Sequence, residues 1–106
     1  MASSALSHPE PTMLVIGVLQ AQFEVSWSRS LKDKRRVVRG IKDRVRARYN
    51  VSVAECGDQE EWRTTTVGVV MAGSDTRFVA SQMDMILDLL RAHPDAELVD
   101  SEVEIL

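Results

Sequence analysis

Residues 13–25 read MLVIGVLQAQFEV. Every second side chain from Val15 to Val25 is apolar or a glycine, so one face of an extended segment carries a continuous apolar row. The opposite face begins with Leu14, Ile16 and Val18 and then becomes polar, with glutamine or glutamate at 20, 22 and 24. The two-residue period predicts a long strand. Because its first half is apolar on both faces, we expect this strand to lie inside a sheet.

Two segments downstream have apolar side chains at spacings of three and four, which predicts helices over residues 30–49 and 76–92. Ser30 is a favourable N-cap for the first helix, with Asp33 in the position of a short capping box. Pro94 stops the second helix. The segments 51–56, 62–71 and 98–106 are predicted strands.

The last predicted strand divides its side chains between two faces. Val99, Val103 and Ile105 are expected on one side, and Asp100, Glu102 and Glu104 on the other. The overall order is strand, helix, strand, strand, helix, strand. This order predicts an α+β, ferredoxin-like sandwich, in which a four-stranded antiparallel sheet carries two helices on one face.

The chain has 106 residues, which is the length of a single domain. We expect residues 13–106 to form that domain and residues 1–12, which are small, polar and proline-containing, to be a disordered tail. No apolar run approaches the roughly 20 residues that cross a bilayer, and the start of the chain lacks the order of a signal peptide. The expectation is a cytoplasmic protein without a membrane partner.

Charge is divided unevenly along the chain. Residues 29–48 hold ten Lys or Arg and two Asp, a net charge of +8, while the other residues sum to −11. On a helix with 100° per residue, five of these cations fall within about 80° of one another along about 21 Å. We name this set the basic stripe: Lys32, Arg35, Arg39, Lys42 and Arg46. Such a row is a candidate contact for successive phosphates of RNA, and it is equally the pattern of a solvated helix face.

Lys34 differs from the stripe because it falls on the apolar side of the same helix. A structural ion pair with Asp33, Asp58 or Glu61 would satisfy it. A phosphate or substrate anchor is the alternative.

The segment 57–62, GDQEEW, is a polar loop that ends in an aromatic residue. Asp58, Gln59 and Trp62 are candidate contacts to RNA, with the indole stacking on a base. The alternative is a plain turn in which Trp62 covers a sheet edge. Trp27, between the first strand and the basic helix, is interpreted as an anchoring residue of its loop.

Catalytic motifs are missing from the sequence. There is no phosphate-binding G-x-x-x-x-G-K-[ST] pattern, and a lone cysteine, Cys56, excludes an internal disulfide and a cysteine-based zinc cluster. The acidic row of the last strand is interpreted as a solvated face, because hard cations need ligands from several elements. We therefore expect a non-enzymatic protein with no catalytic residues, no cofactor and no metal site.

Several segments of the chain resemble the YlxP-like family of small bacterial proteins, a family of unknown function. The resemblance covers residues 13–106 in order and is carried by Ser30–Val37, Val51–Glu55, Gly57–Gln59 with Trp62, Pro94–Asp100 and Glu104–Leu106. It implies the ferredoxin-like fold. Genes of that family often neighbour genes for transcription elongation, translation initiation and small-subunit maturation, which implies work on RNA or the ribosome. It implies no catalytic residue, and Cys56 stands where the family suggests an aliphatic residue.

Two functions follow as expectations. The first is a factor that binds RNA or the ribosome through the basic first helix. The alternative is a homodimeric structural or protein-interaction module with no nucleic-acid role, in which Leu14, Ile16 and Val18 form the dimer face.

Overall fold

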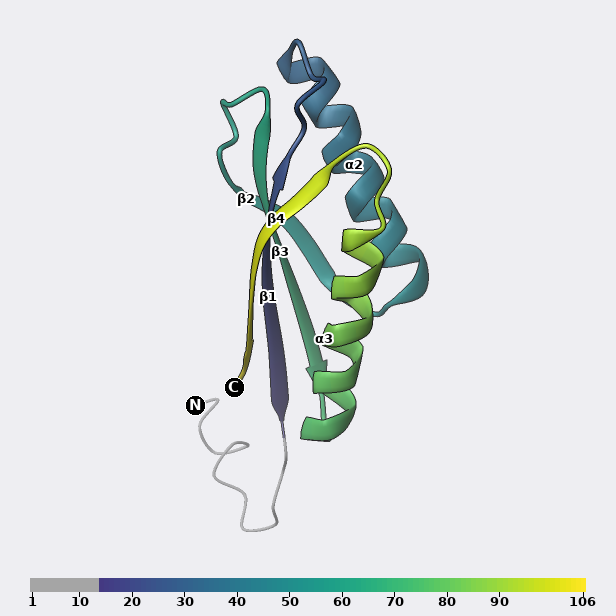
Figure 1. Ribbon diagram of the computed structural model, residues 1–106. Helices are drawn as coiled ribbons and strands as arrows, with labels where there is room; N and C mark the ends of the chain where they lie inside the picture. The colour runs from purple at the N-terminus through teal and green to yellow at the C-terminus, as the bar shows by residue number, and fades with distance from the viewer. Residues whose placement is uncertain (1–13) are drawn as a thin grey trace.

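The computed structural model describes residues 14–106, so the tail predicted at 1–12 lies outside the described residues. Four strands and two helices follow one another in the predicted order (Figure 1). Their bounds are β1 Val15–Glu24, α2 Leu31–Arg48, β2 Ser52–Gly57, β3 Thr64–Gly73, α3 Thr76–Arg91 and β4 Glu97–Ile105.

The strands form one sheet in the order β2-β3-β1-β4, and every neighbouring pair is antiparallel. Both helices lie on the same side of the sheet (Figure 1). The prediction of an α+β, ferredoxin-like sandwich is confirmed. The prediction that the first strand lies inside the sheet is also confirmed, because β1 pairs with β3 on one side and β4 on the other.

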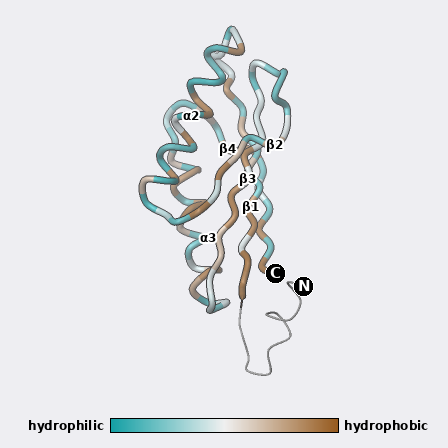
Figure 2. Tube along the Cα trace, turned by 180° about the vertical axis from the view of Figure 1, so that it is seen from behind, coloured by the Kyte–Doolittle hydropathy of each residue, from teal (hydrophilic) through white to brown (hydrophobic). Residues whose placement is uncertain are grey.

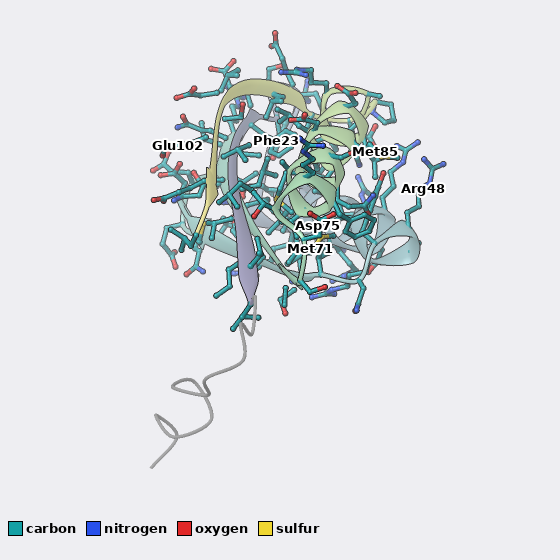
Figure 3. All side chains as sticks on the ribbon, turned by 90° about the horizontal axis from the view of Figure 1, so that it is seen from below. Phe23, Arg48, Met71, Asp75, Met85 and Glu102 are labelled. Atoms are coloured by element: carbon teal, nitrogen blue, oxygen red, sulfur yellow. The ribbon has the colours of Figure 1, made fainter. Side chains whose placement is uncertain are left out.

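The core lies between the sheet and the helices, where β1 supplies its inward row. Leu19, Ala21, Phe23 and Val25 are fully buried. Figure 3 shows Phe23 on the helix side of β1, while Glu102 of β4 points away from the helices. Figure 2 shows the hydrophobic residues concentrated along β1 and β3, whereas much of α2 is hydrophilic.

α2 begins as the sequence predicts. The Ser30 side chain accepts a hydrogen bond from the Asp33 N–H at 3.0 Å, and the Asp33 carboxylate accepts one from the Arg29 N–H at 3.0 Å. The first bond satisfies an amide group that the first turn of a helix leaves unpaired, and the second ties the residue before the N-cap to that turn. The start of α2 is therefore fixed relative to the end of β1.

The outer face of the sheet is divided between apolar and acidic residues. Val18 pairs with Val70 and Ile16 with Ala72, so the apolar residues gather near the start of β1. Farther along the same face, Gln20 pairs with Glu102 and Gln22 with Asp100.

The face predicted for Val99 is wrong. Asp100 pairs with Gln22, but the next partner of β4 is Leu98, which pairs with Phe23. This shift in register leaves Val99 as an extra residue, as in a β-bulge. Leu98 therefore takes the inward place that alternation assigned to Val99.

α3 approaches the sheet closely at two glycines. A Cβ added to Gly17 on β1 would lie 2.6 Å from Cγ1 of Val79, and one added to Gly73 on β3 would lie 2.6 Å from Cγ2 of the same valine. Neither distance is compatible with van der Waals contact. Val79 thus occupies the space that two side chains would otherwise fill.

Gly17→Ala is expected to destabilise the protein by about 1–3 kcal/mol, because the added methyl group overpacks the contact with Val79. The measurement is the midpoint of urea unfolding. Adding Val79→Ala to Gly17→Ala should recover part of the loss. Gly40→Ala is the matched control: its Cβ would lie 3.8 Å from His93, and it should stabilise α2 by about 0.5–1 kcal/mol. Equal effects of the two alanine substitutions would contradict the close approach.

Candidate nucleic-acid interface

Lys34 places a positive charge in the interior of the molecule. It stands in the first turn of α2, and its side chain is 0% exposed. Its Nζ lies 3.1 Å from Oε2 of Glu55 on β2 and donates a hydrogen bond of 3.1 Å to the carbonyl of Thr64 on β3. It also donates to the carbonyl of Asp58 in the loop between these strands. An ammonium group has three donors, so these three acceptors occupy them all.

The prediction of a structural ion pair at Lys34 holds, but the predicted partner was wrong. The carboxylate is that of Glu55, and Asp58 contributes its backbone carbonyl rather than its side chain. Glu55 pairs with Val67, whose side chain is buried, so Glu55 faces the helices from the edge strand. Its Oε2 also accepts a hydrogen bond of 2.7 Å from the hydroxyl of Thr65, a buried residue. No donor of Lys34 remains for a phosphate.

The loop between β2 and β3 is held by these bonds. Asp58 has φ of 62°, and its carbonyl accepts both from Lys34 and from the Glu61 N–H. The side-chain amide of Gln59 donates to the Glu55 carbonyl at 3.2 Å. Of the three predicted loop contacts, Gln59 is therefore engaged within the loop and Asp58 shapes its backbone. Trp62 projects from it with 51% of its surface exposed.

The basic stripe lies on the flank of α2 that faces the free edge of β2. Arg46 shows this directly, because its guanidinium donates a 3.0 Å hydrogen bond to the Val53 carbonyl of β2. One shallow hollow of the surface is lined by Arg35, Val38, Arg39 and Lys42 together with Glu55. The stripe thus borders a groove between a helix and a strand, rather than a convex helix surface.

The stripe cations have no carboxylate partner in the part of the chain that the structure describes. Within residues 14–106, ion pairs closer than 4.0 Å join Lys34 to Glu55, Arg36 to Asp33 and Arg91 to Asp88. None of these includes a member of the stripe. Asp43 follows Arg39 by four residues and borders the stripe, yet it forms no such pair. The positive charge of the stripe therefore remains available to a partner.

Two further connections meet at the start of α2. The Trp27 indole donates a 2.8 Å hydrogen bond to the Asp95 carbonyl, as expected of an anchoring residue, and the Arg36 guanidinium lies 6.0 Å from the centre of its ring. Next along the chain, the Ser28 carbonyl accepts a 2.9 Å hydrogen bond from the Arg63 side chain. A second hollow here is lined by Lys32, Asp33, Arg35, Arg36 and Arg39.

The outer face of the sheet is the other candidate surface. Leu14 is 57% exposed and Val70 is 43% exposed, while Ile16 and Val18 between them are half-buried. This places the three predicted dimer-face residues beside Val70 in one apolar patch. Farther along, a polar hollow is lined by Gln20, Gln22, Thr66, Asp100, Ser101 and Glu102. Across residues 14–106, no group of three or more His, Cys, Asp or Glu side chains is placed to hold a metal ion.

His93 follows the C-terminal end of α3 and faces Gly40 of α2. Burial lowers the pKa of its imidazole below the usual value. The Asp95 carboxylate opposes this shift, and the Arg44 guanidinium adds to it. The lowered pKa favours the uncharged imidazole over the imidazolium at neutral pH.

Residues 16–103 match the model of a protein family described as "Protein of unknown function (DUF503)". The chain belongs to this family. A curated relative is 28% identical over 90 residues, which cover 85% of this chain and 98% of the relative: "Uncharacterized protein YlxP" from Bacillus subtilis (strain 168). This places the chain in the YlxP-like group that the sequence resembles.

Among solved structures, the "De novo designed protein Foldit4" is similar to this DUF503 chain, with a TM-score of 0.54 and 16% sequence identity. The likeness covers 88% of this chain and 96% of the designed protein. At this identity the likeness concerns the fold alone. Separately, none of the helices in residues 14–106 is both long and apolar enough to span a membrane.

Lys34→Met is expected to destabilise this DUF503 protein by about 3–5 kcal/mol, because it leaves a half-buried carboxylate and two carbonyls without their donor. The measurement is the free energy of unfolding in urea. Lys32→Met, in the same helical turn but exposed, is the control and should change stability by less than about 0.5 kcal/mol. A Lys34→Met protein as stable as the Lys32→Met protein would rule out the proposed contribution of the buried contacts.

Proposed function

We propose that this protein is a non-enzymatic factor that binds RNA, free or within the ribosome, through the basic stripe of α2. The observation that carries the proposal is a row of surface cations, four exposed and Lys42 half-buried, none of which has a carboxylate of residues 14–106 within 4.0 Å. Surface cations of a stable domain are often balanced by neighbouring carboxylates. Asp33, Asp43 and Glu55 lie near the stripe without pairing with it, and the acidic row of β4 lies at the opposite edge of the sheet from β2.

The position of the stripe supports a polyanion as the partner. Its five cations extend over about 21 Å of helix, and the hollow beside β2 contains Arg35, Arg39 and Lys42. A flexible phosphate backbone can follow such a groove and neutralise several charges in turn. Glu55 also lines the groove, but its carboxylate is bound to Lys34 and Thr65.

Contacts of this kind position a nucleic acid without reading its sequence, because every phosphate is alike. The proposed binding is therefore tolerant of sequence and strongly dependent on salt. Each neutralised phosphate of a single strand contributes a slope of about −0.7 to the plot of log affinity against log salt.

A second candidate function is a homodimeric module that joins two copies through the outer face of the sheet. It is supported by the apolar patch of Leu14, Ile16, Val18 and Val70, of which two members are more than 40% exposed. Pairing of two β4 edges is disfavoured, because Asp100, Glu102 and Glu104 would lie opposite the same residues of the partner. The two functions are compatible, since the stripe and the patch lie on different faces.

The triple variant Arg35→Glu, Arg39→Glu, Lys42→Glu is expected to lose RNA binding, and the salt slope of any residual binding should fall by about two. The measurement is fluorescence anisotropy of a labelled RNA at about 50 and 200 mM salt. The matched control reverses three exposed arginines off the stripe, Arg44, Arg48 and Arg91, which changes the net charge equally. Equal loss in both variants would show a general charge effect, and unchanged binding in the first would remove α2 from the proposal.

Val70→Glu is expected to abolish self-association through the outer sheet face while sparing the fold, because Val70 is already 43% exposed. The measurement is the molar mass by light scattering at micromolar concentrations. A wild-type protein that is strictly monomeric there excludes the dimer. A dimer that persists in Val70→Glu requires another interface.

A further inference from the structure

Both tryptophans of the chain lie at one end of the molecule. Trp27 precedes Ser28 in the connection from β1 to α2, and Trp62 precedes Arg63 at the end of the β2–β3 loop. The two connections are joined twice, by the Arg63 side chain on the Ser28 carbonyl at 2.9 Å and by the Val25 N–H on the Arg63 carbonyl at 2.8 Å. Figure 1 shows the β2–β3 loop and the start of α2 at the same end of the domain.

The indole groups of the two tryptophans are not equivalent. Trp27 uses its N–H on the Asp95 carbonyl and has the Arg36 guanidinium 6.0 Å from its ring centre. Trp62 makes no side-chain hydrogen bond within residues 14–106 and is 51% exposed. Exposure of so large an apolar surface is costly in water, and it leaves Trp62 as the ring with room for a planar partner.

The loop that carries Trp62 is tied at both ends to the segment that begins α2. The Asp58 carbonyl receives a bond from Lys34 in the first turn of α2, which lies on the apolar side of the helix while Lys32 and Arg35 of the same turns belong to the stripe. At the other end of the loop, the Arg63 side chain is bound to Ser28. Because both ends are tied to the segment that begins α2, little conformational entropy would be lost when a ligand engages the indole.

The charge around Trp62 is opposite in sign to the charge of the basic stripe. Glu60 and Glu61 line the hollow around Trp62 together with Arg63, so the surroundings of the indole are acidic and disfavour a phosphate there. The stripe, by contrast, is positive and has no aromatic residue. A ligand that satisfies both surfaces carries an uncharged planar group for the indole and phosphates for the stripe.

We propose that the ligand is an unpaired segment of RNA, with one base stacked on Trp62 and the adjoining phosphates along the basic stripe. This inference rests on the proposed function and specifies its substrate. Stacking of bases on aromatic side chains is the common device of proteins that bind single strands. In a duplex both faces of each internal base are covered by its neighbours, so the Trp62 indole would find no free base.

The first test uses Trp27→Phe, which leaves Trp62 as the one source of indole fluorescence in the chain. The probe is an oligouridylate of about ten nucleotides, within the range of about 4–16 that single-strand sites occupy. A base stacked on the indole should quench the emission saturably, at the same concentrations at which anisotropy detects binding. An RNA duplex of equal length should bind more weakly and should not quench.

The second test compares two exposed aromatic residues. Trp62→Ala is expected to weaken oligouridylate binding by about 5- to 150-fold, the range measured for a stacked base, while Trp62→Phe should retain most of the affinity. Phe78→Ala on α3 is the matched control, because Phe78 is 55% exposed and lies off the stripe, and it should leave the affinity unchanged.

The outcomes separate this inference from the proposed function. If charge reversal at Arg35, Arg39 and Lys42 abolishes binding while Trp62→Ala does not weaken it and the indole is not quenched, the stacking is overturned and the polyanion contact stands. Equal affinity for the RNA duplex and the single strand would likewise overturn the stacking and leave the polyanion contact standing. If neither RNA binds the wild-type protein, the proposed function fails as well.

Discussion

The buried ammonium group of Lys34 is the interaction on which the arrangement of the molecule depends. It joins the first turn of α2 to β2, to β3 and to the loop between them, because its three acceptors come from these three places. A charge in the interior is tolerated only when it is paired and fully hydrogen-bonded. The geometry of Glu55, Asp58 and Thr64 is therefore constrained together. The same contacts tie the loop that ends in the exposed Trp62 to the end of α2 at which the basic stripe begins.

The sequence predicts the architecture because each element is locally consistent. The two-sided apolar start of β1 specifies an interior strand. The cap at Ser30 specifies where α2 begins, and the spacing of its apolar side chains specifies which side is buried. The burial of Lys34 also follows from its position on the helix. Its partner does not, because Glu55 faces α2 only through the register of β2 on β3. The register shift that displaces Val99 likewise depends on pairing, which no local pattern encodes.

The candidate interface, too, is only partly predictable from the sequence. The five cations share a flank because they share a helix, and helical geometry is regular enough to be read from spacing. That this flank adjoins the edge of β2 is a tertiary fact, seen in the bond from Arg46 to Val53. The junction of the two connections that carry Trp27 and Trp62 is another, since it depends on the hydrogen bond between Ser28 and Arg63, which are 35 residues apart. The groove beside β2 and the junction of these two connections therefore emerge only once the sheet is assembled.

The central position of β1 has a consequence for how the chain reaches this state. Its two neighbours, β3 and β4, begin about 50 and 80 residues later in the chain, so its ladders close only through long loops, and such topologies fold more slowly than local ones. Until both ladders form, the segment from Leu14 to Leu19 is apolar on each side and free along each edge, which is the pattern of an aggregation-prone intermediate. The acidic side chains of β4, the strand that covers one of those edges, leave the finished sheet with a border that repels further strands of the same kind.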